Sequence, residues 1–387
     1  MPTVQMRANA ARVVITGQGN AIPATPTVLR IPGITVSLDL SEDAETVNLL
    51  GNGVEPSREI LSGVVNISSS IEMMLNYHTA AFALGISVGS TTTVESNEGD
   101  WTTGATVTSG TILKGITPAT DDLYCKVGGT TGAVAPDTSA LLQDEEVDDN
   151  GVIWVVNKDR LKEVESGIDA CLPAIAIEYE FKDCDNNLMY IRTLGNSAAS
   201  FSTSIEKKTI PKVTISTNGS VVEDDLDIVT SPYTKLMDIA GANEIIIEPG
   251  FDVRNNQLAM VAGASATYPV LTFGITSDNA QETIDPLNLD RFFTTGVRNV
   301  SGSISGYWDE DLYLAMKNNT DSSLDVTYDD NKGNLISLTL PNVALPLKAP
   351  TFETGMVSKL DTDYKAFGTA ADSAFQYKVR SLQVYNS

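Results

Sequence analysis

The chain repeats one succession of β-strand patterns, and this repeat constrains its fold more than any other feature. Three pairs of stretches match in order: residues 12–17 with 244–250, residues 34–68 with 275–305, and the hairpin pattern at 177–191 with that at 325–338. A repeat of this length predicts two versions of one supersecondary unit. We therefore predict two tandem β domains, over residues 1–222 and 223–387.

The spacing of the matched landmarks indicates where the two domains differ. Ser62-Gly63 precedes Ser301-Gly302 by 239 positions, whereas the hairpin residues Asn187 and Asn334 lie 147 positions apart. The first domain therefore holds about 90 extra residues, too many for an ordinary connecting loop. We place this insertion at roughly residues 85–170. It includes a Gly/Ser/Thr-rich stretch and the acidic run 144–149, which are typical of a loop-rich β subdomain on the surface.

Most other segments alternate apolar and polar residues and are rich in Val, Ile and Thr, a pattern that predicts strands. The clearest examples are residues 13–16, 34–40, 63–71, 174–181, 200–205, 212–216, 302–307, 335–340 and 375–384. Turn-forming residues at 183–187 and 329–334 predict hairpin loops between strands. The fold class is therefore mainly β, a sandwich or rolled sheet in each domain.

Helical patterns are few. The best are residues 57–61, 121–127, 156–165 and 285–294, the last with Pro286 near its start. We expect one or two short helices flanking the sheet of each domain.

Charge and cysteine content exclude several classes of function. The chain of 387 residues has 25 Lys and Arg against 50 Asp and Glu, a net charge of -25, which repels nucleic acid and anionic lipid. No apolar run approaches the roughly 20 residues of a membrane span. The start shows no secretory signal, which predicts synthesis in a cytoplasm. Cys125, Cys171 and Cys184 lack zinc-type spacing, and we expect three free thiols.

The residue patterns give no support to catalysis, and we predict no catalytic, cofactor-binding or metal-binding residue. His78 is the only histidine, so a multi-histidine metal site cannot form, and its neighbourhood is ordinary. Gly17-Gln18-Gly19 lacks the third glycine of a dinucleotide loop. The acidic pairs Asp183/Asp185 and Asp329/Asp330 lack the spaced ligands of a calcium loop, and hairpin tips explain them better. The acidic run 144–149 is likewise interpreted as a solvated loop.

The order of these segments resembles the tail tube proteins of long-tailed bacteriophages. In the first domain the resemblance runs through residues 59–67, a short helix-like piece at 75–85 and the strand at 174–181. In the second it runs through residues 301–307, 335–341, 355–368 and 375–385. The family implies subunits that join edge to edge into rings, and rings that stack into a hollow tube in the virion tail. DNA passes through such a tube without specific binding.

The resemblance also implies partners and an assembly. Tape-measure, tail-terminator and tip proteins are the expected partners. Family members with one tube domain form hexameric rings, so a chain with two domains implies a trimeric ring with pseudo-sixfold symmetry. We expect the insertion to lie outside the tube, and the lumen wall to be net acidic so that it repels DNA.

Other functions compete with this interpretation. Another virion structural protein, such as a capsid, decoration or baseplate component, is the main alternative. A surface adhesin is disfavoured because no signal peptide is visible. A carboxylate glycosidase would need an aromatic-rich cleft, and aromatic residues make up only 6% of the chain.

Overall fold

The computed structural model describes most of the chain, in segments separated by gaps. These are residues 7–17, 20–30, 35–42, 45–49, 57–61, 65–90, 93–96, 99–166, 172–182, 188–206, 211–224, 234–246, 256–262, 266–268, 270–284, 291–308, 310–318, 322–351, 358–369 and 373–382. Strands dominate these residues, so the prediction of a mainly β fold is confirmed.

The elements follow one another in this order. The chain begins with β1 (Arg7–Gly17), β2 (Thr27–Arg30), β3 (Thr35–Glu42), β4 (Glu45–Leu49), β5 (Ser57–Leu61), β6 (Val65–Met74) and α1 (Tyr77–Val88). A segment of short strands follows, with β7 (Val94–Glu95), β8 (Thr106–Val107), β9 (Ile112–Lys114), β10 (Asp122–Val127), β11 (Gly129–Thr130), β12 (Glu146–Asp149), β13 (Val152–Asn157) and β14 (Lys162–Glu165). Longer strands then resume with β15 (Ala174–Lys182), β16 (Leu188–Glu206), β17 (Lys212–Gly219) and β18 (Val221–Asp224).

The C-terminal part repeats this succession without the segment of short strands. After the 3-10 turn η1 (Leu236–Asp238) come β19 (Asn243–Ile246), β20 (Asn256–Ala262), β21 (Ala266–Tyr268), β22 (Val270–Asp278), β23 (Gln281–Ile284), β24 (Phe292–Thr295) and β25 (Asn299–Tyr307). The chain continues with α2 (Glu310–Lys317), β26 (Ser322–Asp329), β27 (Leu335–Ala344), β28 (Lys359–Ala366) and β29 (Gln376–Ser381).

Two sets of six strands pair in the same order. The first strand set is β1-β15-β16-β17-β6-β3, and the second strand set is β20-β26-β27-β28-β25-β22. The fifth strand of each set is β6 or β25. In the chain it is preceded by a hairpin, β4–β5 or β23–β24, and followed by a helix. The registers also agree, because Ile177 pairs with Thr193 as Leu324 pairs with Leu340, 147 positions later.

The ladders correct the matches made from sequence. Met74 of β6 pairs with Lys212, and Tyr307 of β25 pairs with Lys359, so the counterpart of Ser301 is Ser68, 233 positions earlier. The match with Ser62 was wrong, and Ser62 itself lies outside the described residues. A six-residue shift preserves the period-two alternation, so sequence pattern alone does not detect the error.

The match of residues 12–17 with 244–250 was also wrong. The counterpart of β1 is β20, since both pair antiparallel with the strand before the long hairpin. β19 instead lies parallel to β2, with Asn243 opposite Thr27. Residues 247–250 lie outside the described part of the chain. The division at residues 222 and 223 stays a prediction.

Within the described residues, the predicted strands all fall on observed strands, but the predicted helices do not fall on helices. Residues 57–61 form β5, residues 122–127 form β10, and residues 156–165 contribute to β13 and β14. Of the fourth candidate, residues 285–290 lie outside the described part and 292–295 form β24. Cross-strand pairing decides these cases: Tyr124 lies between Ile112 and Val155 in a sheet, which outweighs a weak helical preference. The helix-like piece at 75–85 is confirmed as α1.

The main core lies between the strands of both sets and includes α1. Every side chain described in α1 is buried, among them Phe82 and Leu84 at 0% exposure. Asn76 and Thr79 fix the start of this helix: the Thr79 N–H donates to Asn76 Oδ1 (2.7 Å), and the Asn76 N–H donates to Thr79 Oγ1 (3.0 Å). This reciprocal cap lets an apolar helix begin inside the core with satisfied backbone donors.

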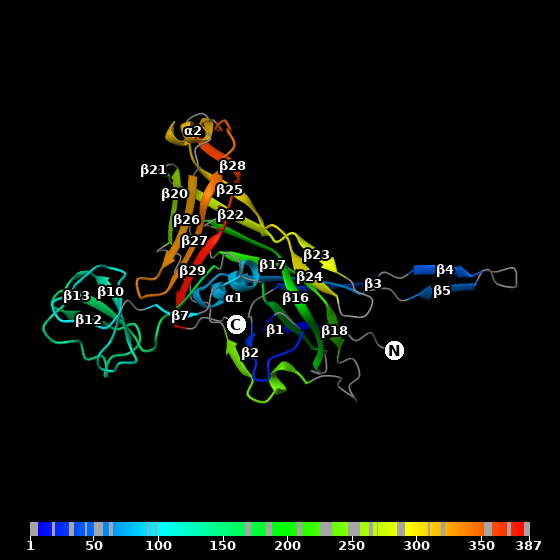
Figure 1. Cartoon of the computed structure of the whole chain (residues 1–387), viewed down its shortest axis with the longest axis horizontal. Helices are drawn as coiled ribbons and strands as arrows, with labels where there is room; N and C mark the ends of the chain where they lie inside the picture. Colours follow the sequence, from blue (N-terminus) through cyan, green and yellow to red (C-terminus); the bar gives the residue numbers. More distant parts are fainter. Residues whose placement is uncertain are drawn as a thin grey trace.

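The segment between α1 and β15 forms a small sheet of its own, β12-β13-β10-β9, packed around Trp101 and Trp154. Figure 1 shows it at one end of the molecule, opposite the projecting hairpin β4–β5. The same segment of the chain ends in β14, which pairs with β29, and β29 pairs in turn with β27 of the second strand set. The acidic run was wrongly interpreted as a loop, because its end forms β12 and buries Asp149.

Candidate assembly surface

A single continuous sheet crosses from one strand set to the other. Its order is β3-β6-β17-β16-β22-β25-β28. The junction is possible because β16 is 19 residues long. Its first half pairs with β15, and its second half pairs with β22 from Ser200 opposite Asp278 to Glu206 opposite Thr272. The second strand set therefore adds its own edge strand directly to the sheet of the first.

The two faces of this sheet differ sharply. Phe201, Phe273 and Ile304 point into the core and are at most 6% exposed. The other face, which we call the hydroxyl face, consists mainly of Ser and Thr. Its residues include Ser37, Asp39, Ser41, Ser68, Ser70, Glu72, Lys212, Thr214, Ser216, Ser202, Ser204, Glu206, Thr272, Gly274, Thr276, Asp278, Asn299, Ser301, Ser303, Ser305, Lys359, Asp361, Asp363 and Lys365, with Met74 and Tyr307 at its margin.

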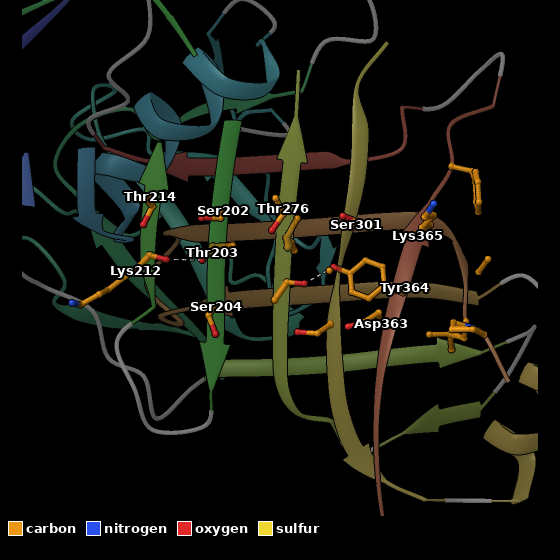
Figure 2. A pocket seen from close by; sticks show the side chains of 18 residues that line it. Ser202, Thr203, Ser204, Lys212, Thr214, Thr276, Ser301, Asp363, Tyr364 and Lys365 are labelled. Carbon is orange, nitrogen blue, oxygen red and sulfur yellow. Dashed lines mark hydrogen bonds between the residues drawn. The ribbon is translucent and has the colours of Figure 1, made fainter. Parts of the chain in front are cut away.

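The middle of the hydroxyl face is hollowed into an open groove of about 900 Å³. Figure 2 shows that its side chains come from neighbouring strands, with Ser202 opposite Thr276 and Ser301 opposite Lys365. The Ser and Thr side chains of the central strands form a polar floor, whereas Leu345, Pro346 and Phe367 add an apolar wall on one side.

Acidic groups outnumber lysines on the hydroxyl face. The carboxylates are Asp39, Glu72, Glu206, Asp278, Asp361 and Asp363, and the ammonium groups are Lys212, Lys359 and Lys365. Lys212 pairs with Glu72 at 2.7 Å, but its side chain is 62% exposed, so this surface pair contributes little to stability. The face as a whole has a net negative charge, which disfavours close approach of phosphate groups.

The acidic pair at the tip of the β26–β27 hairpin has a local structural role. One Asp330 carboxylate oxygen accepts the backbone N–H groups of Lys332 (2.8 Å) and Asn334 (3.1 Å). Asp329 accepts the N–H of Asn331 at 2.7 Å. These bonds fold the turn, in keeping with the hairpin predicted at 329–334. The matching pair Asp183/Asp185 lies outside the described residues.

Across the described segments, no group of three or more His, Cys, Asp or Glu side chains is arranged to hold a metal ion. His78 lies in α1, but its side chain is outside the described part. Cys125 is a buried free thiol, and burial raises its pKa, so it is poorly suited to act as a nucleophile. Cys171 and Cys184 lie outside the described residues.

One buried charge cluster was not detected in the sequence, because its members are far apart along the chain. Arg12 donates to Glu180 (2.6 Å) and Glu244 (3.2 Å), which links β1 and β15 to β19. Next to it, Glu178 accepts the backbone N–H of Leu236 at 3.0 Å. Because these bonds connect β15 with the segment that leads to the second strand set, the cluster has a structural role.

The sequence matches no protein-family model and no curated protein. Within the described segments, no helix is long and apolar enough to cross a membrane. The assembly surface therefore has to be interpreted from its own geometry.

Proposed function

We propose that this chain is a structural virion protein, the tail tube subunit of a long-tailed bacteriophage. The observation that carries the proposal is the β16–β22 junction. It joins two equivalent sheets side by side, with a shared core on one face and a shared hydroxyl face on the other. Because the two equivalent sheets pair edge to edge within one chain, the same edge-to-edge pairing can form between chains.

Repetition of this junction leads to a closed ring. Each chain contributes β3-β6-β17-β16 and β22-β25-β28-β27, and three chains then give a barrel of about 24 strands with cyclic symmetry. At about 4.8 Å between strands and a tilt near 40°, the barrel measures roughly 45–50 Å across its backbone. Barrels of 16–18 strands already enclose an aqueous channel. Three chains suffice because each supplies two equivalent positions.

The hydroxyl face is suited to line such a channel. Its many Ser and Thr side chains are short, which leaves room for a bore, and its acidic excess repels a DNA backbone. At physiological salt this repulsion acts over about 8 Å, enough to keep DNA from adhering without blocking its passage. The tube would accordingly conduct DNA during ejection without binding it.

The hairpin β4–β5 gives the ring a means of stacking. It continues β3 and β6 beyond the sheet, and Figure 1 shows it projecting from the body. Barrel strands are inclined to the barrel axis, so a hairpin that prolongs them leaves through the rim towards the next ring. The subdomain of β8–β13 lies at the other end of the molecule and contributes none of the side chains that line the groove.

Electron microscopy of the purified protein tests this function. We expect stacked rings with a central hole, and a smallest closed particle of roughly 124 kDa, three times the chain mass of 41.2 kDa. Rings of six whole chains would contradict the trimer. Closed shells, or single particles at all concentrations, would instead favour a capsid or decoration protein.

A further inference from the structure

We infer that the outer edge of β3 pairs with residues 347–351 of a second chain, in an antiparallel register that places Ser37 opposite Thr351. The inference rests on the proposed ring, because it assigns the two strands that close it. It is based on a difference between the two strand sets: among the described residues, the edge of β3 is open, whereas the equivalent edge of β22 is covered.

One sheet edge is covered by a neighbouring strand in the second strand set and open in the first. Val36 of β3 pairs with Ile71, and Phe273 of β22 pairs with Ile304, so β3 and β22 are counterparts. β22 lies between β25 and β16. In the described part of the chain, β3 has β6 as its single neighbour. Leu40 on this strand is 42% exposed.

The segment that can cover the open edge is the counterpart of the second half of β16. β22 pairs with residues 200–206 of β16, and the counterparts of these residues lie 147 positions later, beginning at Leu347. Thr351 pairs with Lys359 just as Ser204 pairs with Lys212, so this segment runs beside β28 as β16 runs beside β17. Its far side carries no other strand among the described residues, and Leu347 is 57% exposed.

The register of the β16–β22 junction gives the register of the new pair. Ser204 pairs with Gly274, and the counterparts of these residues are Thr351 and Ser37. At the other end of the junction Ser200 pairs with Asp278, which places Leu347 opposite Ser41. Pro350 lacks an N–H, so the new ladder has one donor fewer than a full one. Pairing in this way joins the unpaired backbone N–H and C=O groups of both edges in hydrogen bonds. It thereby removes two open strand edges, which are otherwise prone to non-specific association.

The partner of the β3 edge is then a second chain. The two edges lie at opposite ends of the sheet, with β6, β17, β16, β22, β25 and β28 between them. They would meet within one chain only in a closed barrel of eight strands, whose interior is just wide enough for side chains or one small ligand. In this chain the hydroxyl face is instead open to solvent, with Ser37, Ser303 and Asp361 exposed.

Disulfide cross-linking of the full-length protein tests the register. The double variant S37C/T351C places thiols on directly opposed residues, whose separation suits a disulfide. Mild oxidation should link most chains into covalent dimers and trimers on a non-reducing gel, and reductant should dissolve them. The matched control S37C/A349C is shifted by two residues to a diagonal distance of about 7–8 Å, and should link at least tenfold less. Each single variant measures the background from the native cysteines.

The outcomes separate this inference from the proposed function. Preferential linking of S37C/T351C between chains supports the register, even if electron microscopy shows open chains of subunits and the tube is lost. Tubes in which this pair does not link, or links no better than the shifted pair, would overturn the register and leave the tube standing. A disulfide formed within a single chain would also overturn it.

Discussion

The Tyr364 hydroxyl donates a hydrogen bond of 2.7 Å to the carbonyl oxygen of Gly274, across the intervening strand β25. Gly302 lies beneath this bond, and a Cβ atom at this position would meet both the Gly274 carbonyl oxygen and the Tyr364 ring. The Tyr364 ring also stacks on Phe273, with centroids 5.8 Å apart. A glycine is therefore required at this point of the sheet, next to the junction of the two strand sets.

Replacing this glycine should destabilise the fold. In the G302A variant the added methyl group overpacks the space under Tyr364, and such overpacking costs about 1–3 kcal/mol in free energy of unfolding. Urea denaturation measures the loss. The control is S303A, on the exposed face of the same strand, which we expect to stay within about 0.5 kcal/mol of the wild type. Equal stability of the two variants would show that the sheet relaxes around the new methyl group.

A second prediction concerns the core of the small sheet formed by β9, β10, β12 and β13. Asp149 Oδ2 accepts the indole N–H groups of Trp101 (2.9 Å) and Trp154 (3.2 Å), and its Oδ1 accepts the N–H of Gly132 (2.7 Å). The D149N amide can supply only one accepting oxygen, so at least one buried donor loses its partner. The expected cost is about 1–3 kcal/mol, measured by tryptophan fluorescence during unfolding.

The matched control for this variant is D159N, because Asp159 is exposed. It should leave the unfolding midpoint unchanged. If D149N unfolds with the wild type, the hydrogen bonding that the amide cannot reproduce contributes nothing to the stability of this sheet.

A third prediction concerns pH and Glu178, which is 1% exposed and whose Oε1 has no hydrogen-bond partner. Burial raises the pKa of this carboxyl above its ordinary value of 4.5, although the Leu236 N–H and Arg192 act in the opposite direction. The folded state therefore binds the proton more tightly than the unfolded state. Above the folded pKa the buried carboxylate lowers stability, and this cost disappears as pH falls through the folded pKa.

The E178Q variant should accordingly be more stable than the wild type at neutral pH, and its advantage should shrink as the pH approaches 4.5. Denaturation curves between pH 8 and 4.5 give the free energy of unfolding of both proteins. Subtracting one from the other removes the contribution of the other titrating groups. E282Q, at an exposed position, controls for the loss of one charge. A constant or growing advantage at low pH would contradict the raised pKa.

Sequence pattern predicted the strands well but not their relationships. The hairpin at residues 329–334 carries its own signal, because its Asp and Asn side chains bond the backbone of the turn. The register of the repeat has no such local signal. Ser301 matches Ser62 as well as it matches Ser68, since the two positions differ by an even number of residues. Only the ladders distinguish them.

The assembly surface could not be predicted for the same reason. Ser and Thr occur throughout the chain, and strand register decides which of them share a face. The junction depends on Ser200 meeting Asp278, two residues with no local pattern in common. The helix α2 escaped detection because its eight residues are too few for a clear helical period.

The last prediction concerns the charge of the proposed channel. Asp361 and Asp363 lie on the hydroxyl face of β28, both exposed, and the second of them lines the groove. Each change from Asp to Lys raises the net charge by two units, so D361K/D363K converts the acidic excess of this face into a small basic excess in every chain. A basic wall neutralises phosphates and releases their counterions, which favours binding at low salt.

Wild-type tubes should not retain short duplex DNA in a sedimentation assay, whereas tubes of the variant should retain it at low salt and release it as salt increases. The control D137K/D159K places the same charges on exposed positions outside the hydroxyl face and should retain much less. Retention of DNA by wild-type tubes, or equal retention by both variants, would show that the hydroxyl face does not line the channel.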